Sequence, residues 1–237
     1  MSKIQFCIKN WHAVAPGKSS PEDWHSHNKD DDSSSSTQAI PSDLIPPMMR
    51  RRMSSLSKMA VQTALTLTKE VTPNYAVFSS RHSELPRTVT LVESILKGED
   101  ASPMAFSQSV HNTASGLYTI AAGHAVPVTS VSAGEDSLHA GLIEATAYLA
   151  CHPDHTVLLV DFDEPMPTPY DRFDSIEHSG YAFGMLMTAG DEVSVEQEPL
   201  THTQLTAPQA ISVIQGLCDA SSAWSIPGSR NGWRWSR

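Results

Sequence analysis

Strand-like and helix-like segments alternate along this sequence, and the alternation predicts an α/β protein with a mixed, mostly parallel sheet flanked by helices. The run TVLLVDF at 156–162 is almost continuously apolar, which is typical of a central strand buried on both faces. In the run SSLSKMAVQTALTLT at 54–68, the apolar residues recur at helical spacing instead. The chain has 237 residues, 40% of them hydrophobic, which is enough to bury a substantial core.

The other elements follow from the same two periodicities. Alternating apolar residues and short β-branched or aromatic runs predict further strands at 4–14, 75–80, 128–133 and 181–188. Helical spacing predicts further helices at 85–96, 112–123, 137–150 and 206–218. Ser54 or Ser55 can cap the helix that begins near residue 55, and Pro73–Asn74 ends it.

Two segments fall outside this pattern. Residues 17–47 are rich in Ser, Asp, Asn and Pro and include DDDSSSS, so we expect a long, partly mobile surface loop there. Residues 1–220 then form a single domain that carries this loop as an insertion. Residues 221–237, which contain Trp224, Trp233 and Trp235, are expected to be an irregular tail.

Composition excludes several classes of protein. The net charge is −10, from 26 acidic and 16 basic residues, which disfavours nucleic acid as a partner. The three cysteines, Cys7, Cys151 and Cys218, are far apart, so we expect neither a zinc site nor disulfides, and a reducing compartment. No apolar run approaches the ~20 residues of a membrane span, and the N-terminal residues are too polar for a signal peptide. The sequence therefore predicts a cytoplasmic protein without a membrane span.

Some polar motifs could carry chemistry, but each has a simpler explanation. Ser55 and Lys58 match a serine–lysine pair, although a capping serine and a solvated lysine explain them. The groups His25-x-His27 and His152-Pro-Asp-His155 could bind a metal, but they lie in a polar loop and a turn, so we expect no metal and no cofactor. Three acidic residues end the most apolar strand, where we favour a solvated strand exit over a ligand site: Asp161, Asp163 and Glu164.

The segment from Ser102 to Ala145 resembles the β-ketoacyl synthases of the thiolase superfamily. In that family the region runs from a Ser-Pro pair, through a helix with Asn and Gly, to a strand and a catalytic Cys that opens the next helix. The matching residues of this chain are Ser102–Pro103, Asn112, Gly116, Gly123 and Pro127. This register places Glu135 on the nucleophilic Cys, or Gly134 if it slips by one residue, with Ser137 on a small residue that follows.

The resemblance covers roughly Ile4 to Gly190 and implies half of a thiolase-like fold. The family's second half, which carries two catalytic histidines, has no counterpart here. The implied function is therefore that of a catalytically silent chain-length factor, which heterodimerises with a full-length β-ketoacyl-ACP synthase and meets the acyl carrier protein through that complex. The short form most resembles the ketosynthase-like proteins of aryl polyene pathways, a type II polyketide system related to fatty acid biosynthesis.

The resemblance also implies which residues would meet the partner. Thiolase folds dimerise by antiparallel pairing of the strand before the nucleophile. In this chain that strand comprises Val126, Pro127, Val128, Thr129, Ser130, Val131 and Ser132. Residues expected to contact the growing chain or the partner's tunnel are Met104, Phe106, Val110, His111, Asn112 and Leu117. We expect at least half of these tunnel candidates to be ordinary core residues, because apolar residues default to burial.

Two other functions stay open at this level. One is a stand-alone acyl hydrolase that uses Ser137 with His111 or His139, although His139 would point to another face of the helix. The other is an acyl-carrier-protein binding module, which the acidic net charge disfavours because carrier proteins are acidic too. For Glu135 the hypothesis is a structural plug whose buried carboxylate is paired or hydrogen-bonded.

Overall fold

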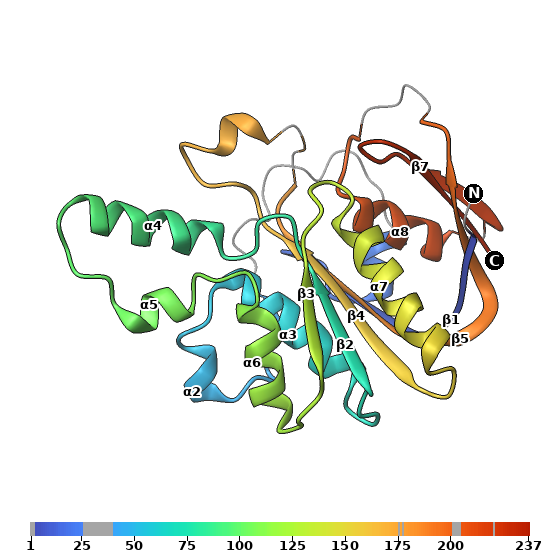
Figure 1. The fold of residues 1–237 in the computed structure, drawn as a ribbon, viewed down its shortest axis with the longest axis horizontal. Coiled ribbons are helices and arrows are strands. Elements are labelled where there is room, and N and C mark those ends of the chain that lie inside the picture. The colour runs from blue at the N-terminus through green and yellow to red at the C-terminus, as the bar shows by residue number, and fades with distance from the viewer. Residues whose placement is uncertain (1–2, 26–39, 175, 177, 201–204, 220) are drawn as a thin grey trace.

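The computed structural model describes residues 3–25, 40–174, 176, 178–200, 205–219 and 221–237. Its centre is one mixed, seven-stranded sheet with the order β3-β2-β4-β5-β7-β6, while β1 pairs with β5 outside this path (Figure 1). The strands are β1 Lys3–Val14, β2 Tyr75–Ser79, β3 Val128–Val131, β4 Thr156–Asp163, β5 Tyr181–Glu198, β6 Ala223–Ile226 and β7 Gly232–Ser236. Among the described strands, β2 pairs in parallel with β3 and β4, and the other pairs are antiparallel. The predicted α/β class with a mixed sheet is confirmed.

Helices cover both faces of the sheet and form a separate core on each. The helices are α1 Pro21–His25, α2 Pro47–Arg50, α3 Ser55–Leu67, α4 Leu85–Leu96, α5 Pro103–Ser107, α6 Thr113–Ala122, α7 Ser137–Cys151 and α8 Gln209–Cys218, with a 3₁₀ turn η1 at Asp171–Phe173. Along β2, Ala76 and Phe78 join the core under α3 and α6, whereas Tyr75 and Val77 join the core under α7 and α8. This alternation follows from the two-residue period of a strand.

The helix α3 begins as the sequence predicts. The Ser54 side chain accepts a hydrogen bond from the Ser57 backbone nitrogen and so caps the helix. The helix packs very close to β5, because a side-chain carbon at Gly184 would lie 2.7 Å from Leu67 and 2.9 Å from Thr63. Gly184 therefore permits the approach that buries the apolar face of α3.

The prediction of an irregular C-terminal tail is wrong. Residues 223–236 form the hairpin β6–β7, which extends the sheet beyond β5. In β7 the side chains of Trp233 and Trp235 are buried while Arg234 is exposed, which is the alternation of a half-buried strand. The turn between the two strands contains Pro227 and Gly228, a turn signal that the prediction overlooked.

The predicted loop at 17–47 is too broad. Its described parts contain α1 and the start of α2, and they bury two apolar side chains. Trp24 is 6% exposed and lies under the Lys18 ammonium, while Ile45 is 1% exposed. The buried side chains of Trp24 and Ile45 therefore attach the two described parts of residues 17–47 to the domain. Residues 26–39 lie outside the described part of the chain.

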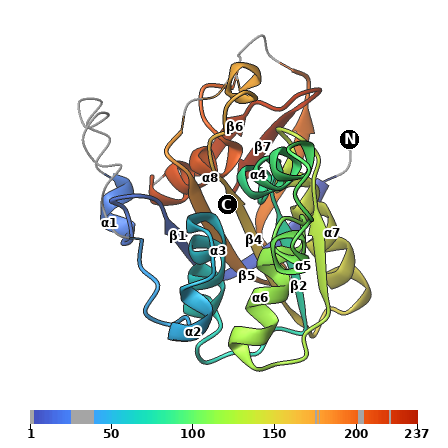
Figure 2. The ribbon, with the colours of Figure 1, turned by 90° about the vertical axis from the view of Figure 1, so that its left-hand side faces the viewer.

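The helices α4 and α5 form an arm that extends away from the body of the protein (Figure 1). Leu91 is the one side chain of α4 that is buried. Five large apolar side chains on the arm are 47–81% exposed: Val92, Ile95, Leu96, Met104 and Phe106. Figure 2 shows the same arm from its tip, in front of α6 and beside β3.

The C-terminal hairpin is fastened to α7 by a buried polar network. Trp235 Nε1 donates to His139 Nε2 at 3.0 Å, so His139 Nδ1 carries the proton that it donates to Gln209 Oε1 at 2.5 Å. Gln209 Nε2 in turn donates to Asp136 Oδ1 at 2.8 Å. The Trp233 ring stacks on His139 at 4.4 Å, and its Nε1 also donates to Asp136 at 3.2 Å.

Burial of His139 predicts a loss of stability in acid. Desolvation lowers the pKa of His139 from 6.5 to about 4. Between pH 6.5 and 4, only the unfolded chain takes up this proton, so stability falls as the pH falls through that window. We expect this group to contribute about 3 kcal/mol of that loss. Denaturant unfolding of the wild type and His139→Gln at several pH values measures it as the difference between the two curves, and parallel curves would contradict it.

Candidate functional site

The candidate site is the turn between β3 and α7, where the resemblance described above predicts the position of the nucleophile. Gly134 has φ +61°, a backbone conformation that glycine adopts without steric cost. Ser137 begins α7, and its hydroxyl donates to the Gly134 carbonyl at 2.7 Å and accepts from the Ala133 amide at 3.0 Å. The turn is therefore a tight, internally hydrogen-bonded connection from strand to helix.

Glu135 follows that glycine and is not the buried, paired carboxylate that we expected. Its side chain is only partly buried, and no hydrogen bond reaches its carboxylate from any residue that the structure describes. The next residue fills that role instead. Asp136 accepts from Gln209, from Trp233 and from both the amide and the hydroxyl of Ser229, and these bonds lower its pKa against the effect of burial. The carboxylate that anchors the turn is thus adjacent to the predicted one.

The residues of the alternative hydrolase do not form a catalytic arrangement. The Ser137 hydroxyl is used within the turn, and His139 is held by Gln209 and Trp235. His111 lies elsewhere, with its Nε2 3.0 Å from the Ser80 carbonyl. A serine hydrolase needs the serine and its base within hydrogen-bond reach of each other. The observed contacts leave neither histidine as a base for Ser137.

A small pocket lies beneath the turn, at the carboxyl ends of the parallel strands. It is lined by residues from several parts of the fold, among them Arg81 after β2, Glu135 in the turn, Asp161 on β4, Tyr181 on β5 and Gln209 on α8. The pocket has room for about one water molecule. In the described part of the chain, this site is therefore too small to hold an acyl chain.

The acidic end of β4 is buried, so our preference for a solvated strand exit is wrong. Asp161 is 3% exposed and Asp163 is 1% exposed. Asp161 accepts from the Ser79 hydroxyl at 2.6 Å and from the Tyr181 hydroxyl at 2.8 Å. Asp163 accepts from the Arg81 amide at 2.9 Å and from the Arg81 guanidinium at 3.2 Å. The sequence places these acids at a strand end but does not reveal the arginine and hydroxyl groups that pair with them.

Burial and nearby negative charge alter the acidity of this cluster. Desolvation, with Asp163 adding to it, raises the pKa of Asp161 to about 7. Desolvation and the neighbouring carboxylates Glu84 and Asp163 also raise the pKa of Glu164 to about 7. Near neutral pH these two carboxyl groups are therefore partly protonated, whereas the Asp163 carboxylate is paired with Arg81.

The strand expected to form the dimer interface lies at an open edge. β3 pairs with β2 on one side, and no described residue pairs with it on the other. The Val126 side chain is buried, those of Thr129, Ser130 and Val131 are half-buried, and those of Pro127, Val128 and Ser132 are exposed. The strand is fixed from within, because the Thr129 hydroxyl bonds the Tyr75 hydroxyl and the Ser130 hydroxyl bonds Ser115.

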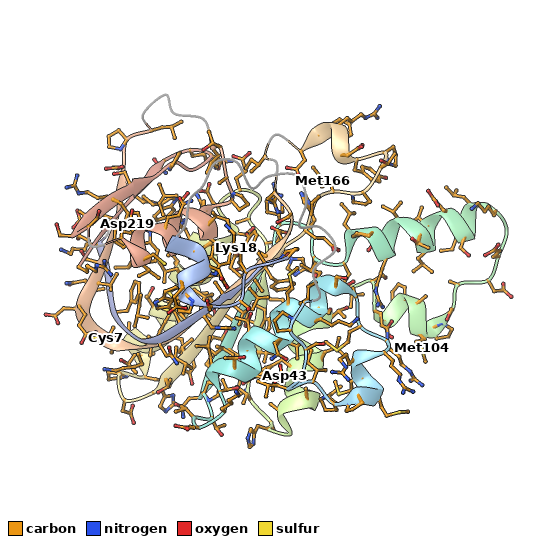
Figure 3. All side chains as sticks on the ribbon, turned by 180° about the vertical axis from the view of Figure 1, so that it is seen from behind. Cys7, Lys18, Asp43, Met104, Met166 and Asp219 are labelled. Carbon is orange, nitrogen blue, oxygen red and sulfur yellow. The ribbon has the colours of Figure 1, made fainter. Side chains whose placement is uncertain are left out.

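The tunnel candidates are more exposed than expected, and the expectation that half of them are core residues is wrong. Met104 and Phe106 are 53% and 60% exposed on the arm. Figure 3 shows Met104 there, far from Cys7 and Asp219. Asn112 is exposed, Val110 and His111 are half-buried, and Leu117 alone packs against a core cluster. The reason for the exposure of Met104 and Phe106 is that α5 projects from the domain and packs against α4, which is itself largely exposed.

The other motifs have structural roles. Ser55 is exposed in the first turn of α3. The His152 and His155 rings stack on each other at 4.9 Å, and Tyr148 bonds His155. No group of three or more potential ligands among the described residues could hold a metal ion. The side chains of His25 and His27 lie outside the described residues.

No helix in the described chain is long and apolar enough to cross a membrane.

Comparison with known proteins identifies the class. The chain matches the model of the β-ketoacyl synthase N-terminal domain family over residues 22–236, and it belongs to that family. The predicted resemblance is thereby confirmed, and the match extends beyond Gly190 into the C-terminal hairpin. No curated protein matches the chain.

Solved structures narrow the comparison. The chain is similar to one chain of a structure described as the ketosynthase (ApeO) in complex with its chain length factor (ApeC) from Xenorhabdus doucetiae, with 30% identity, a TM-score of 0.88, and coverage of 99% of this chain and 100% of that chain. The ishigamide ketosynthase/chain length factor matches at 11% identity and a TM-score of 0.71, over 99% and 98% of the two chains. A β-ketoacyl synthase from Burkholderia phymatum matches at 13% identity and a TM-score of 0.59, over 90% and 71%. These last two similarities concern the fold alone.

The raised pKa of Asp161 predicts a stability change opposite in sign to that of His139. The folded chain keeps this proton up to about pH 7, whereas the unfolded chain loses it near pH 3.8, so stability falls as the pH rises between the two values. We expect Asp161→Asn to remove a loss on the order of 1.4 kcal/mol per pH unit in that window. Unfolding midpoints between pH 4 and 8 measure this, and Asp43→Asn is an exposed carboxylate control. An unchanged slope in Asp161→Asn would refute the prediction.

Proposed function

We propose that this chain is a non-catalytic, chain-length-factor-like subunit that pairs with a full-length β-ketoacyl-ACP synthase and shapes the acyl tunnel of the complex. The main observation is that the turn which carries the nucleophile in the family holds Gly134, Glu135 and Asp136 instead of a cysteine. Claisen condensation on an acyl-enzyme requires a thiolate that can carry the acyl group. None of the three cysteines lies at this turn, and Cys7 is buried in β1.

A similar solved chain supports the proposal. This chain covers 100% of a chain from the structure of the ketosynthase ApeO with its chain length factor ApeC, at 30% identity. We propose aryl polyene chain elongation as the pathway class.

The open edge of β3 supports pairing with the ketosynthase. In a parallel pair, alternate residues of a strand direct their backbone groups to the neighbour. The Pro127 and Val131 carbonyls accept from β2, so the backbone groups of Val128 and Ser130 point toward the open edge. An exposed edge with an apolar side chain is a template for an added strand. The partner's equivalent strand would satisfy these groups.

The arm is our candidate for the contact with the growing chain. Five large apolar side chains of the arm are exposed, and in Figure 2 the ribbon of the arm projects on the side of the molecule where β3 lies. A partner that paired with β3 would therefore come near α4 and α5. Phe106 and Met104, both on α5, would then close one end of the partner's tunnel. The acyl carrier protein would be met through the ketosynthase, because a chain with a net charge of −10 is poorly suited to attract an acidic carrier on its own.

A charge at the open edge is expected to prevent assembly. Val128 is 36% exposed, so Val128→Lys leaves the isolated fold intact but places an ammonium group where the partner strand would pack. Co-expression with the ketosynthase, followed by size-exclusion chromatography with mass detection, should give a one-to-one complex for the wild type and at least about a tenfold loss for the variant.

Leu200→Lys is the matched control, because Leu200 is 46% exposed and follows β5 on the far side of the sheet from β3. It should assemble like the wild type. A Val128→Lys chain that still forms the complex would exclude β3 as the interface, and a wild type that forms none would overturn the proposed function.

Removal of the Phe106 side chain on the arm is expected to lengthen the acyl product. Phe106→Ala opens space where Phe106 would block the tunnel, so the complex should release acyl chains longer by one or more extension units. Mass spectrometry of the acyl carrier protein measures the distribution. Phe173→Ala is the control, since Phe173 is 64% exposed but lies outside the arm. If both variants keep the wild-type distribution in an intact complex, Phe106 does not limit chain length.

A further inference from the structure

The arm formed by α4 and α5 joins the body of the protein at one end and points away from it (Figure 1). The main contact that α4 makes with another element is with α5, and Leu91 is the one side chain of α4 that is buried. The direction of the arm therefore depends on the contacts at its base, where the chain leaves β2 and where it returns before α6.

A buried carboxylate, that of Glu84, lies at this base. Glu84 comes directly before α4, and its side chain is 2% exposed. Its Oε1 accepts from the hydroxyl groups of Ser54 at 2.6 Å and Ser57 at 2.5 Å, at the start of α3. Its Oε2 lies 3.2 Å from Nε of Arg87, in the first turn of α4. Glu84 thus links the arm to α3 in the body, and its charge is paired as a buried carboxylate requires.

Arg87 connects the two helices of the arm with each other and with the body. Besides its ion pair with Glu84, one terminal nitrogen of Arg87 donates to Gln108, the residue that follows α5. The other terminal nitrogen donates to the Arg52 carbonyl, which precedes α3, at 2.7 Å. A planar guanidinium directs its donors at fixed angles, whereas a lysine ammonium is a point charge on a flexible stem. The three partners of Arg87 therefore orient α4 relative to both α5 and the body.

Two further hydrogen bonds join the chain that enters the arm to the chain that leaves it. The Thr88 hydroxyl donates to the Ser109 carbonyl at 2.8 Å, and the Ser83 hydroxyl donates to the His111 carbonyl at 3.0 Å. Ser83 also has φ +46°, a left-handed conformation that is unfavourable for a residue with a side chain. Such a conformation persists where surrounding contacts hold it, and here the Ser83 amide donates to Ser80 Oγ at 2.7 Å. The base of the arm is therefore a constrained junction.

We propose that Arg87 is a positioning residue, which fixes the direction of the arm in the free chain and so presents Met104 and Phe106 to the partner in one orientation. These two side chains are 53% and 60% exposed, so their own packing does not orient the arm. A surface that is ordered before binding loses less conformational entropy when the partner binds. The presentation to a ketosynthase rests on the proposed function, whereas the fixed direction of the arm does not.

A distance measurement between two spin labels on the purified full chain tests the fixed direction. One label is placed at Leu96→Cys, the exposed last residue of α4, and the other at Cys151, the exposed last residue of α7. Cys218→Ser is present in every chain, and Cys7 is buried and is not labelled. Double electron–electron resonance should give one narrow distance distribution. Arg87→Ala should widen it at least about twofold, because the arm then samples several directions.

A second variant leaves the buried ion pair of Glu84 in place. Thr88→Val combined with Gln108→Ala removes two contacts across the base of the arm and should also widen the distribution. Thr90→Val is the matched control, because the Thr90 hydroxyl bonds a carbonyl within α4, and it should leave the distribution narrow. Arg87→Lys keeps a positive charge beside Glu84 and should restore part of the narrow distribution. An unchanged distribution in both Arg87→Ala and the double variant would overturn the proposal.

Co-expression with the ketosynthase tests the consequence for assembly. Arg87→Ala should lower the yield of the one-to-one complex at least about tenfold, and Arg87→Lys should regain part of it. A full yield from an Arg87→Ala chain whose distance distribution is widened would overturn the role of the fixed arm in assembly. If the wild type forms no complex, the proposed function fails, whereas the spin-label distances still decide whether Arg87 fixes the arm. Circular dichroism of each variant establishes that it is folded.

Discussion

The carboxylate of Asp136 connects the start of α7 with α8 and with the C-terminal hairpin. It lies where the turn passes into α7, and it accepts hydrogen bonds from Gln209 on α8, from Ser229 between β6 and β7, and from Trp233 on β7. Several hydrogen bonds to one carboxylate stabilise the contact between these elements, because charge-assisted hydrogen bonds are stronger than neutral ones. The C-terminal hairpin packs against α7 through Trp233 and Trp235, and His139 is thereby excluded from water.

The sequence predicts where the turn between β3 and α7 lies, but it does not predict the hydrogen-bond partners of the polar groups around that turn. Helix and strand periodicity located β2, β4, α3 and α7, and the resemblance located the turn at Glu135. The partners of each polar group could not be found in this way, because contacts such as Arg81 to Asp163 join residues 82 positions apart. The pattern Ser-Ser-Arg at 79–81 does not distinguish a solvated strand end from a buried one. Burial was decided by tertiary packing that sequence periodicity does not contain.

The predictions for the C-terminal tail and for the apolar residues of the arm were wrong for opposite reasons. The tail contained a clear alternation at Trp233, Arg234 and Trp235, but three tryptophans close to a chain end suggested irregularity. On the arm, the apolar residues Met104 and Phe106 suggested burial, and they are exposed instead. Hydrophobicity alone reports that a side chain is best removed from water. It does not say whether the same chain or another molecule will cover it.

The exposed arm also has a consequence for how much of this protein a cell can hold. A copy without a partner exposes five large apolar side chains on the arm, Val92, Ile95, Leu96, Met104 and Phe106, as well as the edge of β3 that no described residue pairs with. Chaperones and proteases recognise such surfaces, and chains that display them aggregate at ordinary concentrations. Under the proposed function, the abundance of this chain would be set by the supply of the molecule that covers the arm. Two proteins made side by side in matched amounts would meet this demand without separate regulation.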